Sequence, residues 1–295
     1  MIITVTMNPS IDKTLYVNKF RQGATNRVVD STLTPGGKGI NVSIVLKQAG
    51  EPNIAVTLFG GSNGIAIAGK LAIKGIRTEQ IMIPGESRTN IKIISGTEMT
   101  EINEPGPELK EKDIAQLFTV MDKYARSGNI FVFSGSLPRG IGSDIYRRLI
   151  ERVKSKGAIA ILDTYGDALK EGMKAVPYAI KPNIYELYEY KYENFDGVIP
   201  EDYKEFVEKC AEEFLKAGVR LVCVSLGKDG AYFNDGKNKA FCAPEVEDKD
   251  IKSTLGAGDS MVAAIAYSIS HSMSFEKMTD LAMKSAAVAC GEIGL

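Results

Sequence analysis

Residues 130–163, IFVFSGSLPRGIGSDIYRRLIERVKSKGAIAILD, carry the pattern that decides the fold. Ile130–Phe133 and Ile159–Asp163 are short apolar runs, and apolar residues recur at three- and four-residue spacing over Ser143–Lys156. An uninterrupted apolar run is typical of a strand that is buried on both faces, as the strands of parallel sheets are. The segment therefore predicts a βαβ unit.

The same alternation extends along most of the chain. Further apolar runs occupy Ile54–Phe59, Tyr178–Lys181 and Leu221–Ser225, and further amphipathic stretches occupy Lys112–Arg126 and Glu201–Ala217. We therefore predict an α/β fold with a mainly parallel central sheet that is covered by helices.

Two regions interrupt this alternation. Residues 10–34 and about 88–104 contain short β-like pieces without helices between them. Because short turns do not easily join such strands to a parallel sheet, we expect a small antiparallel flap beside it. Such a flap suits a lid or a dimer contact. One domain over residues 1–295 that carries this lid is the economical interpretation.

The composition is that of an ordinary globular protein. Lys and Arg number 36 and Asp and Glu 37, so the net charge of -1 argues against a general nucleic-acid binder. The apolar stretches are shorter than a membrane span, and the first residues lack the features of a secretion signal. Four cysteines without metal or redox spacing predict reduced thiols in a cytoplasmic protein. The single histidine, His271, weakens mechanisms that need a histidine base.

The strongest chemical signal is the motif GAGD at residues 256–259, which opens a predicted helix over Ser260–Tyr267. Small residues before a helix leave backbone N–H groups accessible, and the helix dipole favours an anion there. Asp259 could act as a general base beside that anion. For the isolated motif, a helix start that Asp259 merely stabilises is the structural alternative.

A second glycine-rich segment, PGGKGINV at residues 35–42, leads into an amphipathic helix. Its glycines permit close approach of a ligand, and Lys38 and Asn41 could bind hydroxyls or charge. The segment does not match a Walker A loop, and no GxGxxG occurs in the chain. A glycine-rich helix start without a ligand is the structural alternative.

A third signal lies where a predicted strand ends at Lys181. Asn183 and Glu186 would share the first turn of the next helix, where an amide and a carboxylate could hold a hydrated Mg²⁺. The structural alternative is a capping box with Asn183 as the N-cap, which is the better interpretation of the isolated motif.

Candidate phosphate-binding residues come from two places. Arg139 lies in the loop SGSLPRG, at the carboxyl edge of the predicted sheet, where ligands of α/β sheets bind. Asp12, Arg27, Arg88 and Lys92 lie in the predicted lid. The basic residues could form a local cluster and Asp12 could accept hydrogen bonds from sugar hydroxyls, whereas solvated surface charge is the structural alternative.

One motif points to a different class of enzyme. Residues 60–64, GGSNG, satisfy the GxSxG pattern of a hydrolase nucleophile between a strand and a helix, and His271 follows in the required order. His271 lies between two predicted helices and is more readily explained as a surface residue. A hydrolase based on Ser62 is therefore a remote alternative, and it predicts that His271→Ala abolishes activity.

Six motifs, in order and over essentially the whole chain, resemble those of the ribokinase-like PfkB carbohydrate kinases. They are TMNPSID at 6–12, GGKGINV at 36–42, SGSLP at 134–138, KPN at 181–183, VSLGKDG at 224–230 and GAGD at 256–259. The opening motif, residues 88–92 and EPGP at 104–107 resemble the branch that contains 1-phosphofructokinase and tagatose-6-phosphate kinase. The resemblance implies a three-layer α/β/α sandwich with a β lid through which such proteins often dimerise.

The resemblance also implies an ATP- and Mg²⁺-dependent kinase that converts fructose 1-phosphate to fructose 1,6-bisphosphate. Tagatose 6-phosphate is the alternative acceptor, and a sugar-phosphate sensor without catalysis is the alternative from another class. By the same resemblance, Asp259 takes the proton of the sugar's primary hydroxyl, and backbone amides stabilise the transferred phosphoryl group, namely those of Gly256, Ala257 and Gly258.

The resemblance assigns the remaining contacts as follows. The residues that hold the sugar are Asp12, Gly37, Lys38 and Asn41. The residues that bind its phosphate are Arg88, Arg139 and Arg27. The residues that line the nucleotide channel are Lys181, Asn183, Ser225, Gly227 and Gly230. Glu186 orders Mg²⁺ through water.

Overall fold

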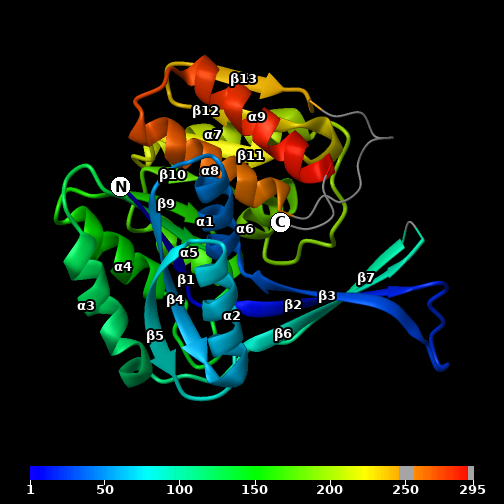
Figure 1. The fold of residues 1–295 in the computed structure, drawn as a ribbon. Coiled ribbons are helices and arrows are strands. Elements are labelled where there is room, and N and C mark those ends of the chain that lie inside the picture. Colours follow the sequence, from blue (N-terminus) through cyan, green and yellow to red (C-terminus); the bar gives the residue numbers. More distant parts are fainter. Residues whose placement is uncertain (97, 246–255, 292–295) are drawn as a thin grey trace.

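The computed structural model describes residues 1–96, 98–245 and 256–291 (Figure 1). A large sheet has the strand order β13-β12-β11-β10-β9-β8-β1-β4-β5. Its strands are β1 (Ile2–Thr6), β4 (Asn53–Gly60), β5 (Arg77–Ile83), β8 (Ile130–Ser134), β9 (Ile159–Asp163), β10 (Ala179–Ile180), β11 (Leu221–Ser225), β12 (Ala231–Asn234) and β13 (Lys239–Cys242). In this order, the seven strands β11, β10, β9, β8, β1, β4 and β5 are parallel to one another, whereas β12 and β13 are added antiparallel at one edge.

Helices cover both faces of this sheet. One layer packs against Phe131 and Phe133, and it consists of α3 (Ala115–Tyr124), α4 (Ile145–Lys154), α5 (Gly166–Met173), α6 (Ile184–Lys191) and α7 (Tyr203–Lys216). The other layer packs against residues such as Val132 and Ala55, and it consists of α1 (Lys38–Gln48), α2 (Gly61–Ile73), α8 (Ala257–Ser270) and α9 (Phe275–Gly291). Successive strand residues point to opposite layers, as pleated geometry requires. The predicted three-layer α/β/α sandwich is confirmed.

A separate small sheet forms the lid, which projects from the body in Figure 1. Its order is β3-β2-β6-β7, with β2 (Ser10–Val17), β3 (Val28–Gly36), β6 (Arg88–Ser95) and β7 (Glu98–Asn103). Both hairpins are antiparallel, but their inner strands β2 and β6 pair in parallel. The prediction of an antiparallel flap is therefore wrong at its centre. The reason is that β2 and β6 follow β1 and β5, which are parallel and end at the same edge of the main sheet.

Most of the predicted elements appear within a few residues of their expected ends. The largest difference concerns the amphipathic stretch 112–126, which consists of a 3₁₀ turn, η1 (Glu111–Ile114), and then α3. The Asp113 carboxylate accepts a hydrogen bond from the Lys110 N–H at 2.7 Å and so caps the start of η1. In the part of the chain that the structure describes, no helix is long and apolar enough to cross a membrane.

Candidate active site

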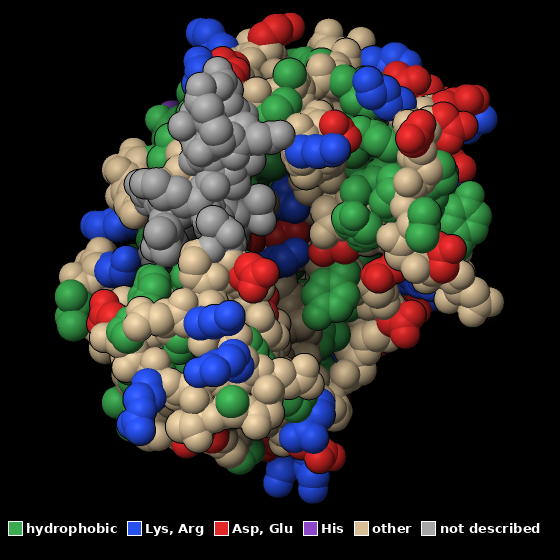
Figure 2. All heavy atoms as spheres, turned by 90° about the vertical axis from the view of Figure 1, so that its right-hand side faces the viewer, with side chains coloured by type: hydrophobic (Ala, Val, Ile, Leu, Met, Phe, Trp, Pro, Cys, Tyr) green, Lys and Arg blue, Asp and Glu red, His purple; other side chains and the backbone are tan. Residues whose placement is uncertain are grey.

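A cleft of about 1260 Å³ lies between the lid and the carboxyl edge of the main sheet. Figure 2 looks onto this side of the molecule and shows the hollow, with side chains of both charges inside it. The lining combines lid residues, the ends of β1, β8 and β10, and the starts of α1, α6 and α8. Segments that are distant in the sequence therefore meet in one cavity at the edge where ligands of parallel sheets bind.

Most of the predicted site residues line this cleft. They are Asp12, Gly37, Lys38, Asn41, Arg88, Lys181, Asn183, Glu186, Ser225, Gly227, Gly230, Gly256, Ala257, Gly258 and Asp259.

Two predicted phosphate ligands do not line the cleft. Arg27 is exposed and directly precedes β3, which reaches the body only at its other end, Gly36. Arg139 is also exposed, and its Nε donates to the Gly106 carbonyl at 3.3 Å. Within this chain, Arg27 and Arg139 therefore do not line the cleft together with Arg88.

Asp259 lies in the first turn of α8, at the floor of the cleft. The turn begins at Gly256, whose φ of 80° lies in the left-handed region that favours glycine. The N–H groups of the first turn have no acceptor within the helix and can bind an anion. Among the described residues, the Asp259 side chain makes no capping bond. Instead, its Oδ2 accepts a hydrogen bond from Asn41 Nδ2 at 2.7 Å, and the residue is 7% exposed.

The surroundings of Asp259 suit a general base. Burial raises its pKa from 3.8 to about 6, and the negative charge of Asp163 adds to this effect. Lys38, the hydrogen bond from Asn41 and Lys181 oppose the rise. A carboxylate with a pKa near neutrality is ionised at physiological pH and still basic enough to accept a proton.

Lys38 lies at the centre of the charged groups in the cleft. Its Nζ is 3.1 Å from Asp163 Oδ1 and 3.6 Å from Glu186 Oε1. Burial alone would lower the pKa of Lys38, but Asp163, Glu186 and Asp259 outweigh burial and raise it. Lys38 therefore remains a cation between three carboxylates.

Asp163 is a site residue that the sequence reasoning missed. Lys38 and Lys181 both contact its Oδ1, the latter at 3.4 Å. Burial would raise the pKa of Asp163, but these two lysines hold it below its usual value. The sequence signal that could have identified Asp163 is its position at the end of an apolar strand, since the ends of parallel strands meet at the ligand-binding edge of the sheet.

The site has the oxygen atoms that a magnesium ion requires. Asp163 Oδ2 is buried and has no hydrogen-bond partner among the described residues, and Glu186 Oε1 lies 3.6 Å from the Lys38 Nζ that also contacts Asp163. In the described ranges no cluster of three or more His, Cys, Asp or Glu could enclose a metal. Two carboxylates fit Mg²⁺, which keeps several waters and commonly binds substrate phosphates.

The capping box that was the structural alternative for Asn183 and Glu186 is confirmed. Asn183 Oδ1 accepts from the Glu186 N–H, and Glu186 Oε2 accepts from the Asn183 N–H, both at 2.8 Å. Since this box uses only Oε2, the other oxygen of Glu186 remains directed toward Lys38. One side chain thus fixes the helix start and presents charge to the cleft.

The lid contributes a buried ion pair and one further cation. Lys92 Nζ lies 2.7 Å from Asp12 Oδ2, so these two charges balance each other. Arg88 donates from Nε to the Asn8 carbonyl at 3.2 Å, and burial lowers its pKa. No ion pair joins Arg88 to a carboxylate in the described part of the chain. Of the two described lid cations that line the cleft, Arg88 is therefore the one available to an anionic ligand.

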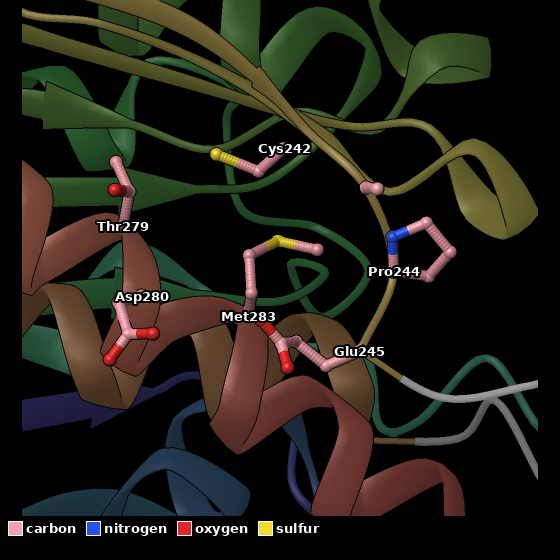
Figure 3. A pocket seen from close by; sticks show the side chains of 7 residues that line it. Cys242, Pro244, Glu245, Thr279, Asp280 and Met283 are labelled. Carbon is pink, nitrogen blue, oxygen red and sulfur yellow. The ribbon is translucent and has the colours of Figure 1, made fainter.

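A smaller pocket of about 420 Å³ adjoins the cleft and shares Pro244, Glu245 and Met283 with it. Figure 3 shows Cys242 and Thr279 at one end of this pocket and Pro244 and Glu245 at the other, with Met283 between them. Burial raises the pKa of the Cys242 thiol, which favours its neutral form.

The structure does not assemble the hydrolase alternative. Ser62 Oγ donates to Glu86 at 3.1 Å. His271 lies at the end of α8, where its ring stacks on Tyr267 and its Nε2 is 3.7 Å from Glu51 Oε2. The serine and the histidine thus have different partners, and neither lines the cleft.

The cleft contains the parts of a phosphotransferase site. A buried carboxylate lies beside the N–H groups of a helix start, cations lie near this carboxylate, and a lid covers the cleft. The pfkB family carbohydrate kinase model matches residues 5–295, and the chain belongs to this family. Its members are enzymes that transfer a phosphoryl group to a sugar hydroxyl. The predicted family and enzyme class are therefore confirmed.

Individual relatives agree with the family assignment. The chain is 36% identical over 278 residues to the 1-phosphofructokinase of Borreliella burgdorferi, covering 94% of this chain and 87% of that protein. It resembles phosphofructokinase-2 from Escherichia coli with a TM-score of 0.90 and 29% identity, covering 99% of this chain and 93% of that one. Ribokinase from Thermotoga maritima, at 23% identity and a TM-score of 0.77, covers 100% and 94% and shares the fold alone.

Proposed function

We propose that the protein is an ATP-dependent 1-phosphofructokinase, which transfers the γ-phosphoryl group of MgATP to fructose 1-phosphate and forms fructose 1,6-bisphosphate. The observation that carries this proposal is the buried Asp259 carboxylate beside the N–H groups of the α8 start. The 36% identity to a 1-phosphofructokinase over most of the chain supports this choice of acceptor.

We assign each residue of the cleft a role in the reaction. Asp259 takes the proton from the sugar's primary hydroxyl, while Asn41 fixes the orientation of its carboxylate. The N–H groups of residues 256–258 stabilise the transferred phosphoryl group, and Lys38 and Lys181 supply positive charge nearby. Glu186 and Asp163 would hold the Mg²⁺, which neutralises charge on the phosphate oxygens when bound. The residues that we assign to nucleotide binding also line the cleft, and they are Lys181, Asn183, Ser225, Gly227 and Gly230.

A panel of acceptors tests the proposed function. ADP release, measured by a coupled assay, is expected to be most efficient with fructose 1-phosphate. Efficient turnover of tagatose 6-phosphate instead would establish the alternative acceptor, which requires the same base, anion site and basic residue. Binding of a sugar phosphate without turnover would identify a sensor and contradict the proposal.

Arg88 is proposed to bind the phosphate that the acceptor already carries. Arg88→Ala is expected to raise the KM for the sugar phosphate about 10- to 100-fold, because a charge-assisted bond contributes roughly 1.5–3 kcal/mol. Steady-state kinetics with each substrate varied in turn measures this effect. Arg139→Ala is the matched control, because Arg139 does not line the cleft and donates to the Gly106 carbonyl instead. A change in the KM for ATP alone would contradict the assignment.

Glu186 allows its two roles to be separated. Glu186→Gln keeps an amide oxygen that can accept the Asn183 N–H bond but removes the negative charge. The Mg²⁺ concentration for half-maximal activity is therefore expected to rise about tenfold or more, with little change in melting temperature. Magnesium titrations of activity measure the Mg²⁺ requirement, and thermal unfolding measures the melting temperature. A lower melting temperature with an unchanged Mg²⁺ requirement would show that Glu186 serves only the helix start.

The proposal includes a homodimer formed through the lid, in the cytoplasm. Exposed apolar residues on the lid support the dimer, and they include Val28, Val29, Leu33, Met99 and Ile102. The four cysteines are free thiols, which is typical of a reducing compartment.

A further inference from the structure

Tyr146 is a buried residue of α4 that the mechanism above does not use. Its side chain is fully buried, and its Oη lies 3.2 Å from the Ser134 carbonyl and 3.1 Å from the Gly135 carbonyl. Burial raises the pKa of this phenol, so it remains a neutral donor. The hydroxyl belongs to the helix layer, and both of these carbonyls lie at the end of β8.

The Gly135 carbonyl receives a second hydrogen bond. Thr164 Oγ1, directly after β9, donates to it at 2.9 Å. Thr164 Oγ1 and Tyr146 Oη thus both lie within hydrogen-bond distance of this oxygen, although Tyr146 shares its single proton between the Ser134 and Gly135 carbonyls. The two buried hydroxyl groups together hold the Gly135 carbonyl toward Tyr146 and Thr164. Gly135 itself has a φ of 96°, a conformation that other residues rarely adopt. The turn is therefore held in one geometry by its sequence and by two hydroxyl groups.

This geometry determines the direction of the next N–H group. In a trans peptide unit the carbonyl and the following N–H point in opposite directions, so the Ser136 N–H points away from Tyr146 and Thr164. Ser136 lines the cleft, and its N–H makes no hydrogen bond among the described residues. Asn8 Nδ2 donates to Ser136 Oγ at 3.3 Å, and Arg88 binds the carbonyl of the same Asn8 at 3.2 Å. The free N–H therefore belongs to the same part of the cleft as Arg88.

We propose that Tyr146 and Thr164 are positioning residues, which turn the Gly135 carbonyl out of the cleft and so present the Ser136 N–H to the phosphate that the acceptor carries. This inference rests on the proposed function, because it requires a phosphorylated acceptor beside Arg88. Without the two hydroxyl groups the peptide unit can rotate, and its carbonyl would then face the acceptor's phosphate and repel it.

The test compares Tyr146→Phe, Thr164→Val and the double variant. Each single variant is expected to raise the acceptor KM about threefold, because one buried donor still holds the carbonyl. The double variant is expected to raise it about thirtyfold, more than the product of the single effects, with the KM for ATP unchanged. Tyr232→Phe is the matched control, because Tyr232 is equally buried but binds Asn234 instead. Melting temperatures show whether each variant is folded.

Calorimetric titration with fructose 1-phosphate gives the same comparison without turnover. If the unmodified protein binds the sugar phosphate and the double variant binds it equally well, the inference is overturned while the proposed function stands. It is also overturned if the KM for ATP rises as much as that for the acceptor. If the unmodified protein neither binds nor phosphorylates a sugar phosphate, both proposals fail.

Discussion

Replacing Asp259 with asparagine is expected to lower kcat by about 10²- to 10⁴-fold and to leave ATP binding largely unchanged. Asparagine has nearly the same shape but cannot accept the proton of the sugar hydroxyl. The N–H groups at the start of α8, which would contact the phosphoryl group, belong to the backbone and remain in place. Steady-state kinetics and nucleotide titration measure the two quantities. Asp122→Asn, which changes a half-buried carboxylate of α3 that pairs with Arg152 and does not line the cleft, is the control.

The same residue determines the expected pH dependence. Because the pKa of Asp259 is raised to about 6, the ionised base is present above that pH and is lost as the pH falls through it. The value of kcat is therefore expected to decrease on the acid side with a midpoint near pH 6. A kcat for Asp259→Asn within a few-fold of the unmodified protein would contradict the base assignment.

Replacing Lys38 with methionine is expected to lower kcat/KM by about 100-fold or more. Met has a similar length but no charge, so the three carboxylates would lose the cation that they share, and in the described part of the chain Lys181 would remain beside Asp163 and Asp259. Because Lys38 lowers the pKa of Asp259, its loss is also expected to move the acid decrease of kcat to higher pH. A pH profile of the variant measures this shift.

Two further variants make the Lys38 result interpretable. Lys47→Met changes an exposed lysine in the last turn of the same helix and is expected to leave activity unchanged. Lys38→Arg keeps the positive charge and is expected to keep the acid midpoint near that of the unmodified protein. If Lys38→Met lost activity but kept its acid midpoint, the electrostatic coupling between Lys38 and Asp259 would be refuted.

The sequence predicts the central sheet well, because buried parallel strands need continuous apolar runs such as residues 130–133. It also predicts Asp259, since a carboxylate directly after small residues at a helix start is a local pattern. Other features have no local signal. The parallel pairing of β2 with β6 joins segments on either side of β4, α2 and β5, and the role of Asp163 appears only when Lys38 and Lys181 converge on it. Arg88 lines the cleft whereas Arg139 does not, and this difference depends on the course of each backbone.

The parallel pairing inside the lid has a consequence for biosynthesis. The β2–β3 hairpin leaves the ribosome well before β6 is translated, since β4, α2 and β5 are made in between. During that interval β2 has an unpaired edge that could join a strand of another nascent chain. A translational pause just before β6 would lengthen the time for which this edge is exposed. Codons that are translated quickly over residues 53–95 would shorten that time.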